Sequence, residues 1–282
     1  MKKKKNYFPA IDGLRLMASI NIVLLHLASS SAFDYAAKWT WLKPIVSGPA
    51  FSAGLFFVLA GFLFASKFSD PDRRIAVLPF VFSRIAKLYR LHFICTILMF
   101  AAVAVKIGGI DKMEHPIRSL LLHLSLLWSL VPDLGMKLNE PSWALTGFFI
   151  CYALTPWTTK KLFKIESVKV LWFLFFLVFV PGIIQGWIFG SHDFLNDADY
   201  ARRFRFFHMF PVIHICEYFF GMIIFRLYQK KQFVFLEKNY VAGFCQFFLF
   251  VALYIVCYLS QNSVSDPRLY FIVRHSPTIL IS

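Results

Sequence analysis

The chain has 282 residues, of which 59% are hydrophobic and 16% are charged, and its mean hydropathy is +0.63. Soluble globular domains contain about 45–50% apolar and about 25% charged residues, so this composition excludes an ordinary soluble domain and a disordered chain. The net charge is +15, but the basic residues lie between apolar blocks, where they favour anionic headgroups over nucleic acid. The sequence therefore predicts an all-α protein embedded in the lipid bilayer, with no nucleic-acid partner.

The apolar blocks predict the helices in chain order, because about 20 apolar residues cross the ~30 Å hydrocarbon layer. We predict spans at 14–33, 45–66, 88–106, 142–158, 168–189, 207–228 and 241–260, and an eighth that begins near 269. The apolar stretch 117–131 has only 15 residues, which favours a short re-entrant or interfacial helix. The expected fold is a polytopic transmembrane bundle that forms one domain over residues 1–282.

The basic segments predict the orientation of this bundle, because positive residues concentrate on the cytoplasmic side. With Lys2–Lys5 inside, the basic segment 67–90 also lies inside. If 117–131 does not cross, the segments 160–169 and 226–238 are inside too, whereas a crossing at 117–131 moves both outside and removes the bias. We therefore predict a multi-pass protein of the cell membrane with a cytoplasmic N-terminus.

The first predicted span carries polar residues, which are costly in lipid and are therefore candidates for function. Arg15 and His26 are 11 residues apart, so on a helix they share one face within about 20° and differ in height by about 16 Å. Ser19 lies on the same face. These three residues, the polar stripe, predict a pathway into the membrane. The structural alternative is a snorkelling Arg15 and a His26 that hydrogen-bonds a neighbouring helix.

Five stretches of the sequence together carry a family resemblance. They are Ile11–His26, Gly54–Leu63, Ser83–Arg90, Pro141–Tyr152 and His214–Met222. The first contains Asp-Gly-Leu-Arg and places ten residues between an arginine and a histidine. In order and approximate spacing, the five stretches resemble the membrane acyltransferase 3 family. Members of that family usually have about ten spans, so this chain is expected to lack the family's last helices.

Some positions depart from the family pattern. Ala60 stands where a serine is usual, Lys87 replaces an arginine, Arg90 replaces a proline, and Phe148 occupies a position that is frequently acidic. The last departure argues against a carboxylate role at that position.

The resemblance implies an enzyme that transfers an acyl group, often acetyl, from cytoplasmic acyl-coenzyme A to a hydroxyl of a cell-surface or exported glycan. A neutral imidazole can take the proton of a sugar hydroxyl during acyl transfer, which makes His26 the candidate base. Glu217 is the second catalytic candidate, and it pairs with Arg15 or His26 or forms a structural ion pair.

The candidate substrate-binding residues are Arg15, Ser19, Arg84, Lys87 and Trp143. A guanidinium binds phosphate in a bidentate way, so Arg15 can hold an anionic part of the donor. The basic residues at 84 and 87 can attract coenzyme A, or they only mark the cytoplasmic side. Trp143 contacts substrate or packs at the membrane interface.

We predict no metal site, because His208 and His214 are six residues apart and face different directions on a helix. His123 lies on the short apolar segment with Trp128 nearby, and the sequence indicates no further partner for it. Two other functions stay open: a transporter or flippase of a glycan or lipid intermediate, and an inactive, truncated family member. A transporter also places buried Arg, His and Glu along a pathway.

Overall fold

The structure is a computed structural model, and it describes residues 8–28, 51–70, 76–131, 138–181, 184, 209, 211–234, 248, 251–252 and 255. All regular secondary structure within these residues is helical, which confirms the all-α class. The α-helices are α1 (Pro9–Ala28), α3 (Phe51–Lys67), α4 (Val77–Ile107), α5 (Pro116–Leu124), α6 (Trp143–Phe163), α7 (Val168–Leu177) and α10 (Pro211–Gln229). Three short 3-10 helices are η3 (Ile110–Lys112), η4 (Trp128–Leu130) and η5 (Glu140–Ser142).

One helix in the described part of the chain, α4, is long and apolar enough to cross a membrane by length and composition. Apolar side chains such as Leu91, Ile94 and Leu98 are exposed along it, as expected for a helix that faces lipid. The helices α1, α3, α6 and α10 overlap predicted spans, and α7 covers the first half of the span predicted at 168–189, most of whose last eight residues lie outside the described ones. Most of the predicted span 241–260 and the whole of the eighth lie outside the described residues. The number of eight spans stays a prediction.

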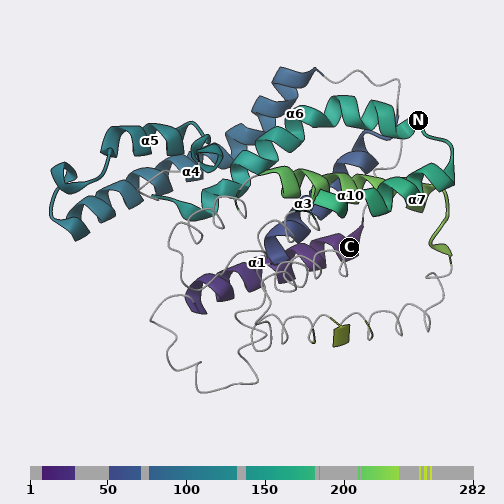
Figure 1. Cartoon of the computed structure of the whole chain (residues 1–282), viewed down its shortest axis with the longest axis horizontal. Helices are drawn as coiled ribbons and strands as arrows, with labels where there is room; N and C mark the ends of the chain where they lie inside the picture. The colour runs from purple at the N-terminus through teal and green to yellow at the C-terminus, as the bar shows by residue number, and fades with distance from the viewer. Residues whose placement is uncertain are drawn as a thin grey trace. The chain divides into compact units, whose positions relative to one another are not determined.

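The chain divides into two compact units, which we describe separately. The first unit contains residues 1–72, 159–193 and 216–282, and the second contains residues 73–158 and 194–215. In the first unit, α1 packs against α3 (Figure 1). Ile11 and Ala18 of α1 meet Leu55 and Leu59 of α3 in a small apolar core.

A reciprocal glycine contact joins α3 and α10 within the first unit. A Cβ atom on Gly61 would collide with the carbonyl oxygen of Tyr218, and one on Gly221 would collide with that of Val58. The two backbones therefore approach so closely that only glycine fits at either position, which is a common way to join helices in membranes. Beside this crossing, the rings of Phe62 and Phe225 pack edge to face with centroids 5.2 Å apart.

In the second unit, α5 folds back along α4 (Figure 1). Gly108 ends α4 in the left-handed conformation, at φ 84°, and the amide of Gly109 donates to the carbonyl of Ala104 at 2.9 Å. This is a Schellman-type helix end. The chain then returns, and Pro116 begins α5 at a position where its missing N–H has no cost. With nine residues, α5 is about 13 Å long.

Candidate functional site

The polar stripe lies on one continuous helix, α1, as predicted. Arg15 is half-buried and the side chain of His26 is exposed. The hydroxyl of Ser19 donates a hydrogen bond to the carbonyl of Arg15 at 2.9 Å, within the same helix. The helix therefore gives Arg15 and His26 the shared face that the spacing indicates.

Asp12 is a partner of Arg15 that our sequence reasoning missed. A carboxylate oxygen of Asp12 lies 4.0 Å from a guanidinium nitrogen of Arg15, three residues further along α1. Both side chains are partly exposed, so this pair contributes little to the stability of the fold. The i, i+3 spacing of opposite charges was the available signal.

Glu217 lies half-buried on α10, next to Tyr218, whose carbonyl faces Gly61 of α3. The close packing of α3 and α10 therefore fixes the position of the Glu217 backbone in the fold. Arg15, Ser19, His26 and Glu217 all belong to the first unit.

The other three predicted residues belong to the second unit. The guanidinium of Arg84 lies over the ring of Phe80, 5.7 Å from its centroid, and Lys87 is exposed on α4. Trp143 begins α6, and its ring centroid is 4.5 Å from that of the buried His214. The contact between Trp143 and His214 was not predicted.

Phe148, which stands at the frequently acidic position, is surrounded by aromatic and aliphatic side chains. Its ring stacks on Tyr152 with centroids 5.7 Å apart, and both rings line a small pocket with Tyr89 and aliphatic residues of α4. None of the described residues that line this pocket is charged. The described lining of this pocket therefore offers no carboxylate at or near position 148.

A buried histidine network in the second unit was not predicted as a whole. His92 of α4 and His123 of α5 are 3% and 0% exposed. The ring nitrogen Nε2 of His92 lies 2.9 Å from the carbonyl oxygen of His123. The hydroxyl of Thr96 and the side-chain amide of Asn139 lie 3.5 and 3.4 Å from Nδ1 of His92. The signal was available, because His92 and Thr96 are polar residues one turn apart in a predicted span.

The partners of His123 determine its protonation. Its Nδ1 lies 2.8 Å from the carbonyl of Ser119 and must donate, because a carbonyl only accepts. Its Nε2 accepts the backbone N–H of Leu138 at 3.2 Å. The ring stacks on Trp128 at 4.8 Å, and the indole N–H of Trp128 donates to Ser142. His123 is therefore a neutral imidazole that holds the chain on both sides of residues 125–137.

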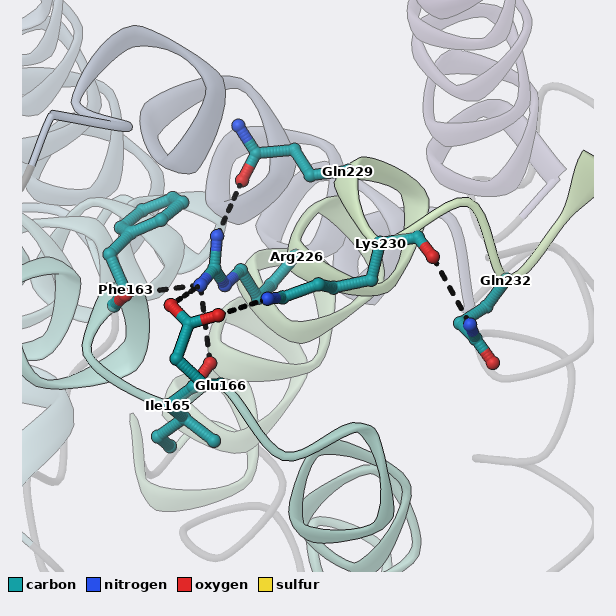
Figure 2. A network of polar contacts seen from close by, with 7 residues as sticks. All are labelled: Phe163, Ile165, Glu166, Arg226, Gln229, Lys230 and Gln232. Atoms are coloured by element: carbon teal, nitrogen blue, oxygen red, sulfur yellow. Dashed lines mark hydrogen bonds and ion pairs between the residues drawn. The ribbon is translucent and has the colours of Figure 1, made fainter.

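An ion network joins the ends of α6 and α10 in the first unit (Figure 2). Arg226 donates hydrogen bonds to the carbonyls of Phe163 and Ile165, at 3.1 and 3.2 Å, and to the carboxylate of Glu166 at 3.0 Å. Lys230 bonds the other carboxylate oxygen of Glu166. The hydrogen bond from Lys230 and the two positive charges lower the pKa of Glu166. Sequence reasoning missed this acidic residue within a basic segment.

No group of three or more His, Cys, Asp or Glu side chains in the described part of the chain is placed to hold a metal ion. The structure thus has a lipid-compatible helix, α4, and ionisable residues carried on otherwise apolar helices. These features are consistent with a helical membrane protein, in which polar groups on apolar helices are candidates for function.

Comparison with known proteins identifies the family. Residues 8–281 match the acyltransferase domain family, and the chain belongs to this family, the acyltransferase 3 family of membrane proteins. The resemblance in the five stretches is thereby confirmed. The chain is also 29% identical over 168 residues to the acyltransferase MdmB of Streptomyces mycarofaciens. That match covers 58% of this chain and 42% of the length of MdmB. No solved structure matches the chain.

Proposed function

We propose that the protein is a multi-pass membrane O-acyltransferase. It moves an acyl group, with acetyl as the first candidate, from cytoplasmic acyl-coenzyme A to a hydroxyl group of a glycan. The observation that carries this proposal is the family match over residues 8–281, together with Arg15 and His26 on one face of α1. The relative's name, an acyltransferase, agrees with the reaction class.

His26 is the base in the proposed reaction. The glycan hydroxyl oxygen attacks the thioester carbon of the donor, and an unprotonated nitrogen of His26 accepts the hydroxyl proton. The carbon–sulfur bond breaks, and the imidazolium returns the proton to the departing thiolate of coenzyme A. The exposed side chain of His26 suits this role, because substrate must reach the ring. A positioned base contributes about 10²–10⁴ to the rate.

The remaining site residues act on binding and charge in this proposal. Arg15, which lies beside Asp12, holds a phosphate or the thioester carbonyl of the donor through its planar fork. Ser19 can accept a hydrogen bond from substrate, since its own proton is given to the Arg15 carbonyl. Glu217 balances the imidazolium of His26 or the charge of Arg15.

The three residues of the second unit extend the binding surface. Arg84 and Lys87 raise the positive potential that attracts coenzyme A. Trp143, already packed on the ring of His214, offers an aromatic edge to a sugar.

The packing of the second unit supports the proposed topology. The rings of Phe80 and Tyr152 are 6.3 Å apart, and Leu145 lines the same pocket as Tyr89, so α6 starts beside the middle of α4 and runs toward its N-terminal end. The antiparallel α5 is about 13 Å long, less than half of a ~30 Å layer. A connection that returns in this way favours a non-crossing 117–131 segment. With that segment not crossing, the bias of positive residues favours a cytoplasmic N-terminus.

The proposal is tested with membranes that contain the full chain and labelled acetyl-coenzyme A. Label on a glycan is the expected result, and His26→Gln should lower the rate about 10²–10⁴-fold at equal protein level. Glutamine keeps a hydrogen bond but accepts no proton at neutral pH. The exposed His115 lies outside the proposed site, so His115→Asn is the matched control and should keep full activity.

Other outcomes decide between the remaining functions. Transfer within about tenfold of the wild type in His26→Gln would remove His26 as the base. Movement of a glycan across the membrane without covalent label would establish a transporter, and neither label nor movement would establish an inactive member.

A further inference from the structure

The turn between α6 and α7 and the end of α10 bring together an excess of positive charge in the first unit. Residues 159–171 and 223–234 contain seven basic side chains and one acidic side chain, Glu166. Five of the basic side chains are exposed lysines, which we call the basic rim: Lys160, Lys161, Lys164, Lys169 and Lys231. Such a density of one sign creates a strong local potential for anions.

The only carboxylate of this region is already engaged. Glu166 accepts from Arg226 with one oxygen and from Lys230 with the other (Figure 2). Arg226, only 12% exposed, also holds the carbonyls on both sides of Lys164. These contacts fix the end of α10 against the end of α6. No ion pair in the described part of the chain involves a lysine of the basic rim, so the charge of the rim is uncompensated within these residues.

An exposed apolar surface begins where the basic rim ends. On α7, directly after Lys169, the side chains of Val170, Phe173, Phe176 and Leu177 are exposed. On α10, Tyr228 is 50% exposed between Arg226 and Lys230. Lysines beside an exposed tyrosine and exposed apolar side chains are typical of the level where a membrane protein passes from headgroups to acyl chains.

We propose that the basic rim binds the headgroups of anionic phospholipids, with the lysines on the lipid phosphates and the α7 side chains among the acyl chains. The inference uses the membrane placement of the proposed function and is independent of acyl transfer. A free phosphate or coenzyme A explains the lysines but not the exposed apolar side chains of α7, because neither ligand has a fatty-acid chain. The combination of charge and apolar surface therefore favours a lipid.

The test uses the full chain in nanodiscs of phosphatidylcholine that contain either spin-labelled phosphatidylglycerol or spin-labelled phosphatidylcholine. The immobilised fraction of each lipid measures its preference for the protein surface. We expect the anionic lipid to be enriched about threefold, and the triple variant Lys160→Gln, Lys161→Gln and Lys164→Gln to reduce this enrichment toward about one. The matched control replaces three exposed basic residues of the second unit: Lys106→Gln, Lys112→Gln and Arg118→Gln. It should keep most of the preference.

A second variant keeps the proposal testable if the triple variant does not insert into the nanodisc. Glu166→Gln removes the one negative charge of the region, so its preference for the anionic lipid should rise. Equal enrichment of both lipids by the wild type would overturn the proposal. So would an equal loss in the triple variant and its control, or displacement of the anionic lipid by stoichiometric coenzyme A, which would make the basic rim a donor site. If the wild-type chain prefers the anionic lipid but transfers no acyl group, the result would count against the proposed function and not against lipid binding by the basic rim.

Discussion

In the first unit, α3 and α10 meet at Gly61 and Gly221, where backbone touches backbone. In the second unit, α4 and α5 meet at His92 and His123, where two buried rings exchange hydrogen bonds with backbone and side chains. Lipid tails are as apolar as leucine, so the hydrophobic effect supplies little force between helices inside a membrane. The two units thus use the two means that remain, which are close packing and interhelical hydrogen bonds.

The glycine contact and the histidine contact should tolerate different substitutions. A glycine crossing is limited by shape, because any side chain must displace a carbonyl that cannot move independently of its helix. A hydrogen-bonded contact is limited by pairing, because each buried donor or acceptor that loses its partner has a large desolvation cost. Substitutions at the two contacts should therefore fail for different reasons and by different amounts.

The largest effect is expected at the glycine crossing. Gly221→Leu should abolish the folded state, since its side chain would have to occupy the position of the Val58 carbonyl. Gly221→Ala should lower the free energy of unfolding by about 1–3 kcal/mol through overpacking. Thermal unfolding of the solubilised chain, followed by tryptophan fluorescence, measures both.

Gly13 provides the matched control for this prediction. It lies inside α1, and a Cβ atom there would meet nothing within 4 Å. Gly13→Ala should stabilise the helix by about 0.5–1 kcal/mol, because glycine loses more conformational freedom on folding. If Gly221→Ala were as harmless as Gly13→Ala, the close approach of α3 and α10 would be wrong.

The sequence was sufficient for the all-α class and for the placement of the polar stripe on one helix, because helical periodicity and hydropathy are local properties. The resemblance of five short stretches was sufficient for the family. It was not sufficient for the glycine crossing or for Glu166, since the partner of each lies far along the chain: Gly61 meets Tyr218, and Glu166 meets Arg226. His123 shows the limit clearly. Trp128 was near enough in sequence to be noticed, but Leu138 and His92 could be found only in three dimensions.

An intermediate effect is expected at the histidine contact. His123→Leu replaces the imidazole with an apolar side chain of similar size, which leaves the N–H of Leu138 without its acceptor and removes the imidazole donor from the carbonyl of Ser119. A buried group left unpaired costs about 1–3 kcal/mol, and the same unfolding measurement should show that loss. Hydrogen exchange at the amide of Leu138 should also accelerate, which a pure packing defect elsewhere on α5 would not cause.

The control for this variant removes an exposed histidine. His115 precedes α5 with φ 47°, a left-handed conformation that asparagine tolerates. His115→Asn should therefore leave both stability and Leu138 exchange unchanged. Equal behaviour of the two variants would show that the buried network contributes nothing specific to the second unit.

The smallest effect is expected at the ion network that joins α6 and α10, because the Glu166 side chain is 75% exposed and surface ion pairs are weak. The bond from Lys230 and the two positive charges hold the pKa of Glu166 below its ordinary value near 4.5. A lowered pKa in the folded state stabilises the fold above the unfolded value, and that stabilisation is lost as the pH falls through the folded value. Wild type should thus be slightly more stable than Glu166→Gln at neutral pH. The difference in stability between wild type and Glu166→Gln should vanish in acid and shrink in about 1 M salt, where the screening length is about 3 Å.

Glu114→Gln is the matched control, because Glu114 is an exposed carboxylate of the second unit with no ion pair among the described residues. It should show no such pH-dependent difference. A stability gap at Glu166 that widens on acidification would show that the carboxylate opposes the α6–α10 contact.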